Sequence, residues 1–205
     1  MSTQEFFGLV SGILVFCSAI PYCIGIWQDR NTPQLISWGL WSFIGLVLLL
    51  TYKSSGAEDN IWPAVFGFTN PLIITMIALF RRNSEKGHMS IADWFCLGFG
   101  ILAICIWAII RDIKELAQIA LYVAILADLF AAIPTARFVW KNPGEERPFA
   151  WGIYALAYGL ALFAVPEVNF SNLALPIYMT TGSSFVALPL VIHRLRNKTP
   201  WRGWI

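Results

Sequence analysis

The segments AIPYCIGIW (residues 19–27) and AIPTARFVW (residues 132–140) share their first three residues and their last one. The same offset of 113 residues, without a gap, pairs further residues along the chain: Trp38-Gly39 with Trp151-Gly152, Pro63 with Pro176, and Arg81 with Arg194. Chance matches favour common residues such as Leu and Ala, whereas these matches are rich in Trp and Pro. The first half of the chain therefore repeats in the second half. An internal repeat in an apolar chain is typical of membrane transporters.

The composition is that of a membrane protein. Of 205 residues, 58% are hydrophobic and 13% are charged, and the mean hydropathy is +0.64. A soluble domain carries about 25% charged residues, and a membrane-spanning helix needs about 20 mostly apolar residues. We expect an all-α membrane protein with no soluble domain, whose seven spans cover residues 6–27, 35–52, 61–80, 91–110, 117–140, 149–165 and 173–192.

The repeat divides the seven predicted spans into three, one and three. We predict a first three-helix repeat over residues 1–85, a linker helix over 86–115, a second three-helix repeat over 116–198 and a tail over 199–205. A single helix between two three-helix units restores the direction of the chain. The two repeats are therefore expected to be parallel and related by an axis along the membrane normal.

Basic residues are distributed unequally between the two ends of the predicted helices. The loops after the first, third and fifth spans, together with the C-terminus, carry eleven of the 14 Lys and Arg residues. Because basic loops stay in the cytoplasm, we expect the N-terminus outside and the C-terminus cytoplasmic, in a bacterial cytoplasmic membrane. The basic and aromatic segment RLRNKTPWRGW (residues 194–204) is expected to attract anionic lipid of the inner leaflet.

The parallel 3+1+3 layout, with a Pro near the inner end of the first helix of each repeat, resembles the SWEET and PQ-loop transporter superfamily. The Pro of the superfamily's Pro-Gln dipeptide falls on Pro21 and Pro134, neither of which is followed by Gln. Its substrate-site Asn falls on Asn70, and the second copy of that Asn falls on Ser183. The resemblance implies transport by alternating access, with sugar as the expected substrate.

The broader clan leaves the substrate and the function class open. It also includes amino-acid exporters, PnuC-type vitamin transporters and the KDEL retrieval receptor. Transport of an amino acid or of a nucleoside-like vitamin therefore remains an alternative to sugar transport. A membrane receptor on the same fold is the alternative to transport itself.

Four prolines occupy matched positions in the two repeats. Pro21 and Pro134 lie inside the first helix of each repeat, where a proline removes one backbone hydrogen bond and can kink the helix. A static kink would explain either one, but the matched pair favours a gating hinge. Pro63 and Pro176 are expected in the first turn of their helices, where proline is tolerated.

Asp128 lies well inside the fifth predicted span, and its repeat counterpart is Val15. A charged carboxylate is costly in hydrocarbon, so this side chain must face the bundle interior, be paired, or be protonated. We expect Asp128 to bind substrate and to carry a coupling proton. A purely structural hydrogen bond to a neighbouring Ser, Thr or Trp is the alternative.

Further side chains complete the predicted substrate site. Asn70 and Ser183 occupy equivalent positions in the third helix of each repeat, where hydrogen bonding between helices is the alternative to substrate binding. The aromatic candidates, which could form a gate or stack on a ring-shaped solute, are Trp41, Tyr154, Trp62 and Tyr178.

No pattern in the sequence indicates an enzyme. The chain has no Ser/His/Asp order, no HExxH motif and no Walker A loop. We therefore expect no catalytic residue, no cofactor and no metal. The expected partners are a small neutral or zwitterionic solute and membrane lipid, without nucleic acid, and a homo-oligomer is left open.

Overall fold

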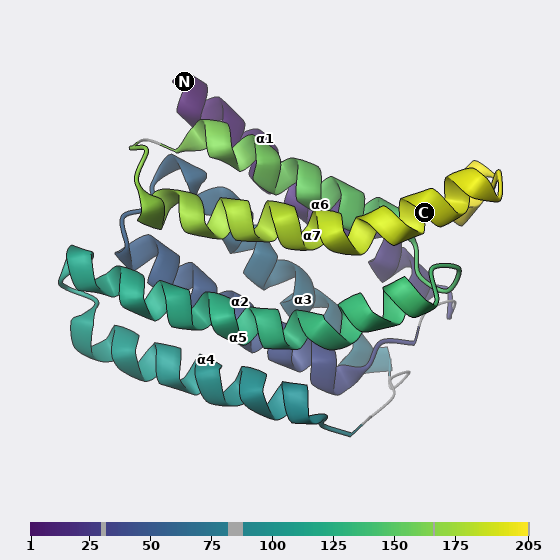
Figure 1. Ribbon diagram of the computed structural model, residues 1–205, viewed down its shortest axis with the longest axis horizontal. Coiled ribbons are helices and arrows are strands. Elements are labelled where there is room, and N and C mark those ends of the chain that lie inside the picture. The colour runs from purple at the N-terminus through teal and green to yellow at the C-terminus, as the bar shows by residue number, and fades with distance from the viewer. Residues whose placement is uncertain (30–31, 82–87, 166, 205) are drawn as a thin grey trace.

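Helices make up most of the computed structural model, which describes residues 1–29, 32–81, 88–165 and 167–204. The α-helices lie side by side along the long axis of the molecule (Figure 1). In the described part of the chain they are α1 (Thr3–Trp27), α2 (Leu35–Ser54), α3 (Trp62–Arg81), α4 (Ile91–Ile110), α5 (Lys114–Lys141), α6 (Pro148–Ala161) and α7 (Phe170–Arg196). Three short 3-10 helices accompany them: η1 (Asp59–Ile61), η2 (Leu162–Ala164) and η3 (Trp201–Gly203). The predicted all-α fold is confirmed.

Six of these helices, all except α6, are long and apolar enough to cross a membrane. The α6 helix has 14 residues and continues directly into η2, so that the helical segment ends at Ala164. A helix of that combined length covers about 25 Å, somewhat less than the roughly 30 Å of a hydrocarbon core. The chain thus has the helices of an integral membrane protein, and the sixth predicted span is shorter than a full crossing.

Local sequence signals determine where the helices begin. At α1 the Ser2 hydroxyl accepts a hydrogen bond from the Glu5 backbone N–H (3.0 Å), and the Glu5 carboxylate accepts one from the Ser2 N–H (2.6 Å). Ser90 and Asp93 form the same capping box at α4. These bonds satisfy N–H groups that have no partner within the helix.

The start of α7 differs from the sequence-based prediction. The Asn169 side chain accepts a hydrogen bond from the Asn172 backbone N–H (2.9 Å), so the helix begins at Phe170, before the predicted start at residue 173. Pro176 consequently lies inside α7, and the expectation that it occupies the first turn was wrong.

We call α1–α3 the first group of helices and α5–α7 the second group. The α3 helix packs against both α1 and α2, and α7 packs against both α5 and α6. The two groups meet where α1 contacts α6 and where α2 contacts α5. The α4 helix packs on α5 and α2 at the margin of the bundle (Figure 1). The predicted boundary at residues 85–86, between the first repeat and the linker helix, lies outside the described residues.

The two ends of the bundle differ in charge. We call the end at which α1, α3, α5 and α7 finish the basic end, because it carries Arg137, Lys141, Arg147, Arg194, Arg196 and Lys198 among the described residues. The other end, where α1 begins, is called the opposite end. The two chain termini lie at different ends of the bundle (Figure 1).

Candidate functional site

The candidate site is centred on Asp128, midway along α5. The Tyr178 hydroxyl on α7 donates a hydrogen bond to Oδ2 of Asp128, at 2.8 Å. The carboxyl group is therefore directed toward α7, and its partner is a phenol instead of the Ser, Thr or Trp considered from the sequence. Two of the predicted site residues, Asp128 and Tyr178, are brought into direct contact.

Two tyrosines of α6 face Gly67 on α3, across the junction of the two helix groups. A Cβ atom at Gly67 would lie 2.8 Å from the Tyr158 hydroxyl oxygen and 3.0 Å from that of Tyr154. Only a glycine therefore lets both phenols approach the α3 backbone this closely. The two rings contact each other with centroids 5.2 Å apart, and the Tyr158 hydroxyl donates to the Pro63 carbonyl at 3.1 Å.

The Thr180 hydroxyl on α7 is a polar group at the position that corresponds to Gly67 in the repeat. Its Oγ1 atom is buried and has no hydrogen-bond partner within the described part of the chain. Because buried polar groups normally have partners, this hydroxyl is available to a bound molecule.

A second polar cluster joins the two groups near the opposite end. The Tyr52 hydroxyl on α2 donates to the Asn172 carbonyl on α7, at 2.9 Å, and accepts a hydrogen bond from Asn60 Nδ2 in η1. All three residues are buried. The Asn172 amide in turn donates to the Glu167 carbonyl at 3.0 Å. These hydrogen bonds hold α2 against α7 at this end.

Aromatic rings join the two groups nearer the basic end. Trp41 on α2 contacts Trp151 on α6, with ring centroids 6.3 Å apart. Trp41 also packs edge-on against Trp38, at 5.2 Å. The Trp38 Nε1 atom donates to the Tyr22 hydroxyl on α1, at 3.3 Å. The candidate Trp41 therefore lies in an aromatic contact between the groups, whereas the candidate Tyr154 pairs with Tyr158.

Three other predicted site residues, Asn70, Trp62 and Ser183, form no hydrogen bond with Asp128. The Asn70 Nδ2 atom donates to the Val15 carbonyl at 2.6 Å, within the first group, while its Oδ1 atom is buried without a partner among the described residues. Trp62 is 43% exposed and stacks on Phe66 of its own helix. Ser183 is buried on α7.

The two predicted hinge prolines lie inside continuous helices. The α1 helix continues past Pro21 to Trp27, and α5 continues past Pro134 to Lys141. Pro21 is half-buried and Pro134 is exposed. Both are placed in the last third of their helices, toward the basic end.

The residue types that commonly bind metal ions do not form a cluster in the described part of the chain. No group of three or more His, Cys, Asp or Glu side chains that could hold a metal ion is found among the residues described.

Comparisons of the chain with protein-family models, with curated proteins and with solved structures give no match. The resemblance to the SWEET and PQ-loop superfamily therefore stays an expectation from the sequence.

Three residues that join the two groups were not singled out from the sequence: Tyr158, Tyr52 and Asn172. For Tyr158 a signal existed, because the repeat pairs it with Gly45 near the middle of a helix. Gly45 packs against the α3 backbone, where an added Cβ would lie 2.9 Å from the Phe68 Cα. Tyr52 and Asn172 lie near helix ends, where polar residues are common, and carry no such signal.

Proposed function

We propose that this protein is a secondary transporter that moves a small neutral or zwitterionic solute by alternating access between two parallel three-helix units, α1–α3 and α5–α7, joined by α4. This arrangement is supported by the helix contacts, because contacts made by helices of the first repeat correspond to contacts made by their counterparts in the second repeat. The position of α3 between α1 and α2 matches that of α7 between α5 and α6, and the α1–α6 contact matches the α5–α2 contact. Parallel repeats that face each other in this way can open at one end while closing at the other.

The observation that carries the proposal is the hydrogen bond between Asp128 and Tyr178 inside the bundle. An ionisable residue within a membrane span is costly and marks a functional site by default. The Tyr154 phenol and the unpartnered Thr180 hydroxyl add neutral hydrogen-bonding groups. Aromatic faces beside neutral donors suit a polar, uncharged solute with a flat or ring-shaped body. Sugar is the expected class, and an amino acid or a nucleoside-like vitamin is the alternative.

The contacts at the two ends act as gates in this scheme. Near the opposite end the units are joined by the bonds from Tyr52 to Asn172 and from Tyr158 to Pro63. Nearer the basic end they are joined by the Trp41–Trp151 contact. Opening one end requires only the contacts at that end to break. Pro21 and Pro134 are the proposed hinges, because each weakens the backbone hydrogen bonding of its helix.

Asp128 is proposed to carry the coupling proton. An ionised carboxylate only accepts hydrogen bonds, whereas a protonated one can also donate. Loading a proton therefore changes what Asp128 can do toward Tyr178 and toward a solute. The protonation state would bias which end of the interface opens.

The test uses purified protein in two steps. A thermal-shift screen against sugars, amino acids and nucleosides first identifies the class of solute that stabilises the protein. Uptake of that solute into proteoliposomes is then measured with and without a pH gradient. We expect Asp128→Asn to abolish uptake driven by the gradient while solute binding and exchange persist. Accumulation against a gradient by this variant would reduce Asp128 to a structural hydrogen-bonding residue.

A further inference from the structure

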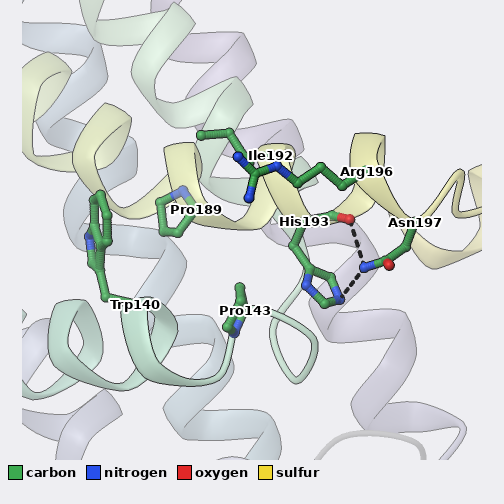
Figure 2. Close-up of a pocket in the computed structure, with 7 residues that line it drawn as sticks. All are labelled: Trp140, Pro143, Pro189, Ile192, His193, Arg196 and Asn197. Atoms are coloured by element: carbon green, nitrogen blue, oxygen red, sulfur yellow. Dashed lines mark hydrogen bonds between the residues drawn. The ribbon is translucent and has the colours of Figure 1, made fainter.

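A groove of about 410 Å³ lies between the ends of α5 and α7 at the basic end (Figure 2). Asp128 and its neighbours do not line it, so it is separate from the proposed transport site. The residues that line it are Trp140, Pro143, Pro189, Ile192, His193, Arg196 and Asn197.

The lining of the groove is apolar on one side and cationic on the other. Trp140 (47% exposed), Pro189 and Ile192 form the apolar wall. Arg196 is exposed, and its guanidinium group has no carboxylate partner among the described residues. Figure 2 shows this group folded back along α7 toward Ile192. No acidic side chain of the described residues lines the groove, so the groove favours a ligand that is both apolar and anionic.

His193 adds a hydrogen-bond donor. The Asn197 Nδ2 atom lies 3.0 Å from His193 Nε2 and 3.0 Å from the His193 carbonyl oxygen. With the amide as donor, the ring proton of a neutral His193 is carried by Nδ1. In Figure 2 this second ring nitrogen lies on the side of the ring that faces Pro143. The ring can therefore donate into the groove.

Arg194 fixes the segments that surround the groove. This buried side chain donates through Nη2 to the carbonyl oxygens of Gly144 (3.1 Å) and Glu146 (2.9 Å), and through Nε to that of Gly203 (2.9 Å). The loop after α5 and the C-terminal segment are thereby tied to α7. The groove is pre-formed, which lowers the entropic cost of filling it.

The first repeat provides an internal comparison. A groove of about 330 Å³ lies between α1 and α3 and is lined by Trp27, the repeat counterpart of Trp140. Among the described residues, no Lys, Arg or His lines this second groove. The repeat counterpart of His193 is Phe80. The position of His193 is therefore occupied by an apolar aromatic residue in the first repeat.

We propose that the α5–α7 groove binds an anionic phospholipid of the membrane leaflet at the basic end. The phosphate would contact Arg196 and His193, and an acyl chain would lie along Trp140 and Ile192. The groove is placed where α7, a helix of membrane-spanning length, ends, and Trp and Arg are the side chains typical of that interface. A free phosphate ion would use only the polar half of the lining, whereas a phospholipid uses both halves.

The experiment measures which lipid stays bound. Full-length protein is reconstituted with equal amounts of phosphatidylglycerol and phosphatidylcholine, and native mass spectrometry counts the lipids retained. We expect phosphatidylglycerol to be preferred. Arg196→Gln should reduce this preference about fivefold, which corresponds to the loss of one direct contact worth about 1 kcal/mol. The control Lys198→Gln removes the same charge from an exposed residue outside the groove and should leave the preference unchanged.

Three results would overturn the assignment. Equal losses in Arg196→Gln and Lys198→Gln would mean general attraction of anionic lipid to the basic end. An unchanged preference in Arg196→Gln would mean that the lipid binds elsewhere. Displacement of phosphatidylglycerol by excess inorganic phosphate would mean that the groove is an anion site without a lipid chain. Circular dichroism and thermal unfolding of both variants establish that the fold is retained, and none of these readouts depends on transport.

Discussion

Tyr178 contributes to the candidate site through its hydroxyl group, whereas the sequence suggested only its aromatic ring. The hydroxyl is the described hydrogen-bond partner of Asp128, and its loss would leave a carboxyl group in apolar surroundings with one partner fewer. A buried acceptor that loses its donor costs about 1–3 kcal/mol.

We expect Tyr178→Phe to lower the free energy of unfolding by about 2 kcal/mol and to impair gradient-driven uptake. Tyr122→Phe is the matched control, because the described hydrogen-bond partner of the Tyr122 hydroxyl is Gln118, one turn away on the same helix, at 3.1 Å. That substitution should cost well under about 1 kcal/mol. Reversible unfolding in mixed detergent measures both variants, and equal costs would contradict a special role for Tyr178.

Gly67 offers a second residue-scale test. An added Cβ would meet the Tyr154 and Tyr158 hydroxyls at 3.0 Å and 2.8 Å, so both phenols must withdraw from α3. We expect Gly67→Ala to destabilise the protein by about 1–3 kcal/mol and to reduce solute binding. A Cβ at Gly152 meets nothing within 4 Å, so Gly152→Ala should be neutral or stabilising because alanine favours helix. Indistinguishable effects of the two substitutions on thermal stability and binding would count against the packing described.

At the scale of helices, the contacts between the two groups differ from those within a group. The Tyr52 hydroxyl links α2 to α7, whereas the Tyr22 hydroxyl accepts its bond from Trp38 within the first group. Tyr52→Phe should therefore weaken the closure of the opposite end, and Tyr22→Phe should not. Hydrogen exchange of the η1 and α7 amides is the measurement. Faster exchange near Asn60 and Asn172 is expected only in Tyr52→Phe, and equal protection in both variants would remove Tyr52 from the gate.

The helices themselves were predictable from the sequence because long apolar runs leave little alternative in a membrane. The prediction was wrong where a single side chain determines the start of a helix. Because Asn169 caps α7, the helix begins at Phe170, and Pro176 lies inside it and not in its first turn. Asp128 was recognisable because an acidic residue in an apolar run is rare. Its partner Tyr178 lies fifty residues away along the chain, and no local pattern predicts which aromatic ring meets a given carboxyl group.

At the scale of the whole molecule, the repeat predicts the environment of many residues at once. Residues related by the offset of 113 should experience related environments, and the matched contacts of α3 and α7 agree with this. Departures from the repeat then indicate specialised positions: Asp128 opposite Val15, and Tyr158 opposite Gly45. Alternating access requires the path between the groups to reach both ends of the bundle in turn.

The most direct test of alternating access uses Thr180→Cys. This substitution is made in a background in which the native cysteines are replaced: Cys17, Cys23, Cys96 and Cys105. Cysteine is close in size to threonine, and the Thr180 hydroxyl is buried without a described partner. A membrane-impermeant thiol reagent is applied to one face of the proteoliposome at a time, with and without a stabilising solute and at two pH values. Alternating access predicts labelling from both faces, in a ratio that solute and pH change. Labelling from one face only, under every condition, would contradict transport and favour a receptor with a pocket open to a single side.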